Sequence, residues 1–156
     1  MQGKPTKCEG CPLFDRGRGF VFPDDSSKPT SLVVIGSGVT ETDVELNQNF
    51  HSQCPSGKRT RYQLEQAGFD LETVRFANVI GCWLPKGTTK DGRAWGNDVP
   101  TVEAMGSCWR RWLQPWLGEL NPRFLVASGN AARRFLLGPQ IGERYNGTIN
   151  RLERMP

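Results

Sequence analysis

The sequence lacks a long apolar run. Its longest runs, at residues 32–35 and 124–127, are far shorter than the roughly 20 residues that a membrane-spanning helix needs. No positively charged and then apolar leader opens the chain, so the sequence does not indicate export and predicts a cytoplasmic protein. Charge of one sign is also scarce, because 20 basic and 16 acidic residues leave a net charge of +4. This excess permits a polyanionic partner without requiring one.

Histidine is nearly absent, with one residue, and cysteine occurs in an odd number, five. Without an export signal, this cysteine count argues against a disulfide framework and points to metal binding, catalysis or plain buried thiols. The 156 residues, 37% of them hydrophobic, can bury one core. We therefore expect a single domain over residues 1–156.

Apolar patterning predicts alternating strands and helices. Runs rich in β-branched residues predict buried strands at residues 31–36, 74–81 and 123–128. Helical spacing predicts helices at residues 58–67, 100–120 and 130–137. Proline at position 115 should kink or split the second of these helices. Buried strands each followed by a helix favour an α/β fold in three layers, with a short parallel sheet between helices.

The segments between these elements read as long loops at residues 1–30, 36–56 and 85–98. In a parallel sheet, functional residues gather in the loops that follow the carboxyl ends of the strands. Those loops begin here at Gly36, Gly81 and Gly129.

Four cysteines are spaced in a way that suits one metal centre. Cys8 and Cys11 form a CxxC pair, Cys82 follows the second strand, and Cys108 lies in the next helix. Thiolates in such a set bind zinc or an iron–sulfur cluster. Zinc sites usually supply two close pairs, so the scattered spacing favours a cluster. The alternative is that Cys82 and Cys108 are ordinary buried small residues.

Several short motifs follow one another along the chain. Residues 8–13 read CEGCPL, and residues 36–50 read GSGVTETDVELNQNF. Asn78 precedes Cys82 by four positions at the end of the second strand. The third strand leads into SGNAARRFLLG at residues 128–138.

In this order the motifs resemble those of the iron–sulfur uracil-DNA glycosylases, the family 4 branch of that superfamily. Its members open with CxxCPL and end their first strand in GEAPGxxEDxxGxPF, whose glycine and phenylalanine have the same separation as Gly36 and Phe50 here. The likeness runs from Cys8 to about Gly138. It implies a uracil-DNA glycosylase-like fold and a 4Fe-4S cluster. The implied cluster ligands, which leave out Cys54, are Cys8, Cys11, Cys82 and Cys108.

The resemblance also implies base flipping, in which a nucleotide leaves the stack and enters a shaped pocket. Phe50 occupies the position whose ring stacks on the flipped base, and Asn78 the position whose amide reads the base edge. An amide offers a donor and an acceptor to a pyrimidine. Gly36 and Gly38 would line the same pocket. The plain alternatives are a buried loop anchor for Phe50 and a strand-end cap for Asn78.

The sequence departs from the family in its reactive motif. Ser37 replaces the family's glutamate, and Asn47 and Asn49 replace the glycine and proline before the phenylalanine. Hydrolysis of the glycosidic bond needs a side chain that positions water, and a serine cannot act as a carboxylate. Glu41 or Asp43 in the same loop could substitute, although loop solvation or helix capping is the simpler role for both.

The family's fourth strand and its His-Pro-Ser type motif have no counterpart before Pro156. Either the natural chain is short or the sequence is part of a longer one. The only histidine, His51, lies beside Phe50. Without a fourth strand the sheet would expose an edge, so we expect a partner or a second copy to cover it.

Contacts with DNA phosphates require cations near the pocket. The helix after the first loop opens with Lys58, Arg59 and Arg61, where amides and cations both favour phosphate. Lys86 and Arg93 lie in the second long loop. These residues are the predicted contacts to single- or double-stranded DNA.

Two functions are therefore expected from the sequence. The first is an enzyme that removes uracil, or acts on a related flipped pyrimidine, with water oriented by Ser37, Glu41 or Asp43. The second is a catalytically impaired DNA-binding or assembly module that keeps the fold and the cluster. A zinc-bearing nucleotide hydrolase is a weaker third reading.

Overall fold

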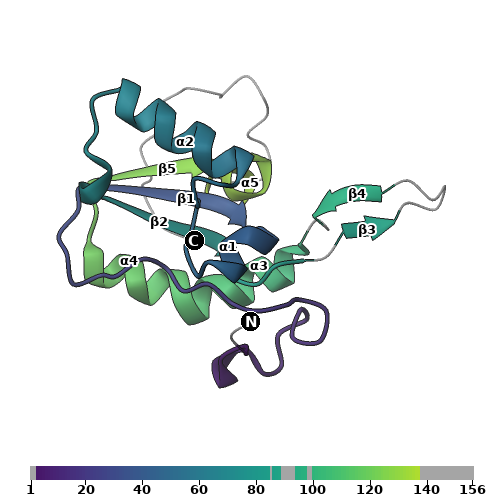
Figure 1. The fold of residues 1–156 in the computed structure, drawn as a ribbon. Helices are drawn as coiled ribbons and strands as arrows, with labels where there is room; N and C mark the ends of the chain where they lie inside the picture. The colour runs from purple at the N-terminus through teal and green to yellow at the C-terminus, as the bar shows by residue number, and fades with distance from the viewer. Residues whose placement is uncertain (1–2, 85, 89–93, 98–99, 138–156) are drawn as a thin grey trace.

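A three-stranded parallel sheet forms the centre of the protein (Figure 1). The structure is a computed structural model that describes residues 3–84, 86–88, 94–97 and 100–137. The strands are β1 (Leu32–Gly38), β2 (Val74–Ile80) and β5 (Phe124–Ser128). They lie in the order β2-β1-β5, with β1 pairing in parallel to both neighbours. All residues of β2 are buried, which explains its continuous apolar run.

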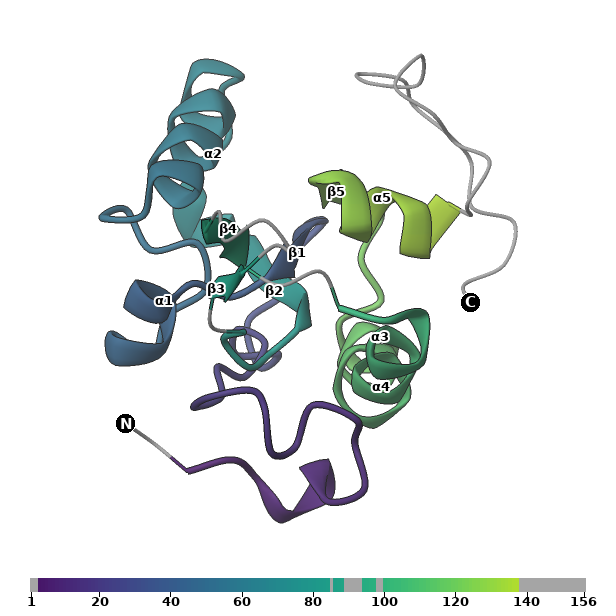
Figure 2. The same ribbon diagram turned by 90° about the vertical axis from the view of Figure 1, so that its right-hand side faces the viewer.

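Helices cover both faces of the sheet, and this confirms the predicted three-layer α/β class (Figures 1 and 2). Alternate residues of β1 point to opposite faces. Leu32 and Val34 share a core cluster with Leu64 of α2 (Pro55–Gln66). Val33 and Ile35 belong to the larger cluster on the other face. The helices of that face are α3 (Val102–Cys108), α4 (Gln114–Leu120) and α5 (Asn130–Leu137).

The helix predicted over residues 100–120 runs without a break from Val102 to Leu120, but it contains an irregular segment just before its proline. A π-helical segment, Trp109–Leu113, separates α3 from α4. The amide of Gln114 donates to the carbonyl of Trp109, five residues back. Pro115 then falls in the first turn of α4, where its missing N–H costs nothing. None of the helices within the described ranges is long and apolar enough to cross a membrane.

Two loops predicted from the sequence contain regular structure instead. Residues 36–56 include the short helix α1 (Glu41–Glu45), which Thr40 and Asp43 begin with a reciprocal capping box. The second loop forms a hairpin of β3 (Lys86–Thr88) and β4 (Ala94–Asn97), paired antiparallel. Both predictions were wrong because the elements are too short to show a period. Single 3₁₀ turns also occur, at Thr6–Cys8 and Leu71–Thr73.

The two edges of the sheet differ. A segment of residues 18–24 runs along β2, where Asp24 and Phe76 exchange hydrogen bonds and the amide of Val21 donates to the carbonyl of Gly81 at 2.8 Å. On β5, Phe124 is 52% exposed and Val126 is 41% exposed. Within the described residues the β5 edge is therefore apolar and open to solvent, and the expected covering partner stays a prediction.

Candidate functional site

Three of the predicted base-binding residues meet at the carboxyl end of the central strands. A Cβ built on Gly36 would lie 2.2 Å from the side-chain oxygen of Asn78 and 2.6 Å from the ring of Phe50. The absent side chain of Gly36 therefore lets the ring and the amide approach each other. Phe50 is 6% exposed and Asn78 is 8% exposed. Gly38, the last residue of β1, has only ordinary contacts at its Cβ position, the nearest at 3.7 Å from Ile80.

The loop that carries Phe50 is held in an unusual backbone conformation. Phe50 has φ of 50°, which is rare for a bulky residue and is kept only where neighbours enforce it. Its carbonyl accepts a hydrogen bond from the Nε of Arg61 at 2.7 Å. The next amide, of His51, donates to the Oδ1 of Asp43 at 2.8 Å. A Cβ on Gly57 in α2 would lie 2.6 Å from the Phe50 backbone, so the helix supports the loop directly.

Sequence reasoning missed a buried residue beside Phe50. Asn49 is 1% exposed, and its Oδ1 accepts a hydrogen bond from the Nδ2 of Asn78 at 3.0 Å. Its Nδ2 donates to the carbonyl of Phe22 at 2.7 Å and, more weakly, to the Oδ1 of Asp24 at 3.4 Å. Burial raises the pKa of Asp24, while the amide of Phe76 acts in the opposite direction. An asparagine in place of the family's proline was the only sequence signal.

The three predicted water-orienting residues have different surroundings. The Oγ of Ser37 accepts a hydrogen bond at 3.2 Å from the amide of Ala132, in the first turn of α5. The N-cap position of α5 is Gly129, which has no side chain, so Ser37 supplies the capping oxygen from another element. Both carboxylate oxygens of Asp43 accept hydrogen bonds within the Thr40–Cys54 region. Glu41 is exposed in the first turn of α1.

The predicted DNA contacts separate into two groups. Lys58 and Arg59 are exposed in the first turns of α2. Arg61 is turned inward, because its guanidinium bonds the Phe50 carbonyl and lies 4.6 Å from the ring centre of Phe76. Only the backbone of Lys86 is described, in β3, and Arg93 lies outside the described residues. The structure therefore gives Arg61 a role in supporting the loop rather than a free phosphate-facing position.

Four of the five cysteines lie in one neighbourhood. Cys8, Cys82 and Cys108 are buried in the larger core cluster, and Cys11 packs against it half-buried. Burial raises the pKa of Cys82 to about 11 and of Cys108 to about 12. The other thiols of the group add to both shifts, since like charges disfavour ionisation. Without metal, burial therefore favours the neutral thiol form of Cys82 and Cys108 at neutral pH.

Donors and cations surround these sulfurs. Burial raises the pKa of Cys8, and the nearby indole N–H of Trp112 acts in the opposite direction. The backbone at Gly81 acts on Cys108 in the same way. Lys4 and Arg111 lie near enough to Cys8 to favour its thiolate. These groups would stabilise negative charge on the sulfurs, which is the form that binds metal.

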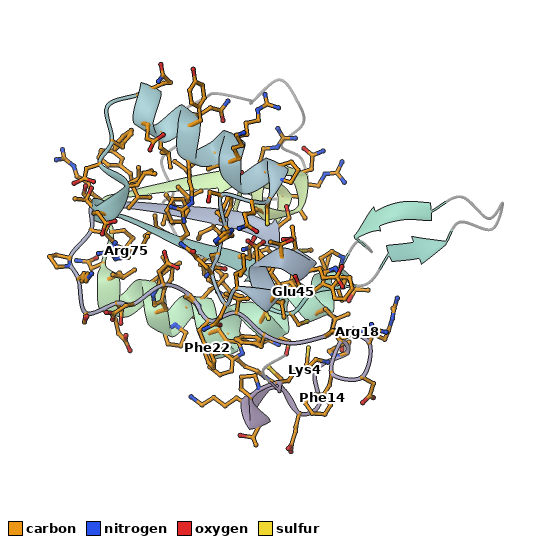
Figure 3. The ribbon with its side chains drawn as sticks, viewed as in Figure 1. Lys4, Phe14, Arg18, Phe22, Glu45 and Arg75 are labelled. Carbon is orange, nitrogen blue, oxygen red and sulfur yellow. The ribbon has the colours of Figure 1, made fainter. Side chains whose placement is uncertain are left out.

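The loop carrying the CxxC pair is fastened to the rest of the fold near its cysteines. Arg111, in the π-helical segment, donates to the carbonyls of Lys7 and Glu9 on either side of Cys8. Lys4 donates to the carbonyls of Leu13 and Phe14 and lies over the Phe14 ring, and Figure 3 labels both side chains in the N-terminal segment. The cysteine loop is thereby joined to the helix that contains Cys108.

The donor chemistry of the four thiols fits a polynuclear cluster. Among the described residues, no group of three or more His, Cys, Asp or Glu side chains is placed to hold a metal ion. Four thiolates around a four-iron cluster lie further apart than four around one ion, because the cluster occupies the space between them. Three buried thiols and one half-buried thiol in one neighbourhood, with donors and cations close to them, have the ligand chemistry that such a cluster takes.

Cys54 belongs to a different environment. It precedes α2, and its sulfur contacts the hydroxyl of Thr40 at 2.9 Å and the Oδ1 of Asp43 at 3.5 Å. Burial raises the pKa of Cys54. Cys54 thus lies outside the core cluster that the other four cysteines share, and the ligand set stays a prediction. In the comparison with protein-family models, no model matches the chain.

Proposed function

We propose that the protein is a DNA base-flipping protein similar to the iron–sulfur uracil-DNA glycosylases. The observation that supports this most strongly is the meeting of Gly36, Phe50 and Asn78 at the end of the parallel strands. A base that entered this site would stack on the ring of Phe50 and present its edge to the amide of Asn78. Because Phe50 and Asn78 are buried, a base bound there would be almost wholly removed from water.

The proposed 4Fe-4S cluster would be held by Cys8, Cys11, Cys82 and Cys108. When bound, it supplies four metal–thiolate bonds and no assigned redox turnover. The residues around it join the N-terminal loop to β2 and to the helix of Cys108. Since Asn78 and Cys82 are only four residues apart, fixing the end of β2 also fixes the amide that would read the base.

A second candidate is binding without hydrolysis, and one observation favours it. The hydroxyl of Ser37 caps α5, and both carboxylate oxygens of Asp43 are used by the α1 cap and the His51 amide. Ser37 and Asp43 are thus used in structural hydrogen bonds. The exposed Glu41 is the remaining candidate for orienting water. Such a protein would recognise a flipped base and leave the glycosidic bond intact.

The test is incubation of the anaerobically purified protein with uracil-containing single- and double-stranded oligonucleotides, followed by alkaline cleavage. Strand breaks at uracil that disappear in Phe50→Ala support the enzyme. Phe69→Ala is the matched control, because that ring is 44% exposed on the surface. Uracil-selective binding without breaks supports the second candidate. Equal affinity for uracil-containing and undamaged oligonucleotides rejects both.

Phosphate contact by Lys58 and Arg59 is tested by the salt dependence of binding. Each phosphate contact that is lost lowers the slope of log affinity against log salt by about one. Replacing both residues with Ala should therefore lower the slope by about two and leave base preference unchanged. An unchanged slope would place the DNA on another face.

A further inference from the structure

The amide of Asn78 sits at the end of a hydrogen-bonded chain whose direction can be read from chemistry. The chain runs from the segment along β2, through Asn49, to Asn78. Its first member, the carbonyl of Phe22, can only accept a hydrogen bond. The side-chain nitrogen of Asn49 must therefore face Phe22, at 2.7 Å.

That constraint fixes the rest of the chain. With its nitrogen toward Phe22 and the Asp24 carboxylate, Asn49 turns its oxygen toward Asn78. An oxygen there requires a donor, so Asn78 faces Asn49 with Nδ2, at 3.0 Å. Reversing either amide would bring two acceptors or two donors together in a buried place, which is costly. The order of donors thus follows from the Phe22 carbonyl alone.

The remaining oxygen of Asn78 points to the candidate base site. It lies 2.2 Å from the position that a Cβ of Gly36 would occupy, on the side where the Phe50 ring also approaches. The site therefore contains an acceptor whose direction is set before any ligand arrives. Preorganised groups of this kind discriminate strongly, because a ligand without the matching donor leaves a buried polar atom unpaired.

We propose that Asn49 is a positioning residue that locks the carbonyl oxygen of Asn78 toward the base site, so that the site selects a base edge with a ring N–H. Uracil and thymine present such an N–H between two carbonyls. Cytosine presents a ring acceptor at the same position, which the locked oxygen repels. The selectivity rests on the proposed function, whereas the orientation of the amides does not.

The orientation is tested without a ligand, by NMR of the side-chain amides in the ¹⁵N-labelled protein. Wild type should show slowly exchanging Nδ2 protons for both Asn49 and Asn78. Asn49→Ala should speed exchange of the Asn78 protons at least about tenfold, since it removes their acceptor. Gln48→Ala, an exposed neighbour, is the control and should change neither signal. Fast exchange at Asn78 in the wild type would overturn the lock.

A second variant covers the case in which Asn49→Ala fails to fold. Asn78→Asp places a carboxylate against the Asn49 oxygen, and Asn49 cannot turn to donate because Phe22 holds its nitrogen. The melting temperature of Asn78→Asp should therefore fall well below that of Asn78→Ala. Equal melting temperatures would show that Asn49 rotates freely, and the proposal would fail.

Selectivity is measured as affinity for single-stranded oligonucleotides that carry uracil, cytosine or 3-methyluracil at one position. Wild type should bind the cytosine and 3-methyluracil probes about tenfold more weakly than uracil, and Asn49→Ala should lose most of this difference. Full discrimination retained in Asn49→Ala would overturn the selectivity role. Absence of any uracil preference in the wild type would reject the proposed function. The amide spectra would still show whether Asn49 fixes the orientation of the Asn78 amide.

Discussion

The base site and the cysteine site satisfy their buried polar groups in opposite ways. At the base site, Asn49 and Asn78 pair with each other and with the protein around them. At the cysteine site, burial and mutual repulsion raise the pKa values of Cys82 and Cys108, and the surrounding donors and cations face sulfurs that carry no charge as thiols. In the first region, the hydrogen bonds between the two amides need no ligand. The second has the features of a site that becomes complete only when metal converts its thiols to thiolates.

The largest expected effect comes from removing one proposed ligand. Cys108→Ser should abolish cluster content and lower the free energy of unfolding by several kcal/mol, because metal binding contributes directly to folding. Iron and sulfide analysis with thermal unfolding measures both. Cys54→Ser is the matched control and should keep full iron content, since Cys54 contacts Thr40 and Asp43 instead. Equal iron loss in both variants would contradict the distinction between these cysteines.

The metal-free protein should lose stability as pH rises. The pKa of Cys108 rises from 9.0 unfolded to about 12 folded, so the thiol form favours folding below pH 9.0. That contribution, roughly 3–4 kcal/mol by the size of the shift, is lost as pH rises from about 9 toward 12. Urea unfolding at increasing pH should show a steeper decline for metal-free wild type than for metal-free Cys108→Ala. Parallel curves would mean that the thiol is less buried than described.

At the base site, the most specific test is a substitution that adds a single methyl group. Gly36→Ala would place a Cβ 2.2 Å from the Asn78 oxygen, and we expect a loss of about 1–3 kcal/mol in stability and of any uracil preference. Gly118→Ala is the control in α4, where nothing lies within 4 Å of the Cβ position. It should gain up to about 1 kcal/mol, because alanine favours helix over glycine. Binding assays and thermal unfolding check both. A harmless Gly36→Ala would show that Phe50 and Asn78 are not in close contact.

The smallest expected effect, that of replacing Ser37, distinguishes a helix-capping role from a water-positioning role. Ser37→Ala should cost about 1 kcal/mol, as expected for a lost N-cap oxygen on α5. Ser56→Ala, at an exposed position of α2, should change stability little. If the alkaline cleavage assay detects activity, a Ser37→Ala loss of much more than tenfold at unchanged affinity would give the hydroxyl a role in hydrolysis. Full activity with lower stability would leave it as a cap alone.

The sequence was enough to predict the three layers, the three strands of the parallel sheet and an irregularity in the helix that contains Pro115. β-branched runs such as that of β2, and a proline in the first turn of α4, carry local signals that tertiary packing did not override. The resemblance predicted that Gly36, Phe50 and Asn78 share one pocket. The structure brings the three residues together, and the pocket itself stays a prediction.

The supporting contacts of the site could not be predicted. Asn49 is held by Phe22 and Asp24, from an irregular segment whose pairing with β2 has no periodic signal. Ser37 serves a helix that begins 93 residues later, at Asn130. A glycine at the N-cap of a helix hints that another residue supplies the oxygen, yet nothing in the sequence says which one.

The π-helical segment restricts evolution of this helix in a particular way. Trp109 and Leu113 are buried, whereas Arg110 is exposed and its identity is free to change. A residue must nevertheless occupy this position, because deleting one residue would restore α-helical spacing and rotate α4 by about 100° relative to α3. Trp116 and Leu117 would then leave the core that Cys108 shares. The stretch between Cys108 and Pro115 should therefore tolerate substitutions far better than insertions or deletions.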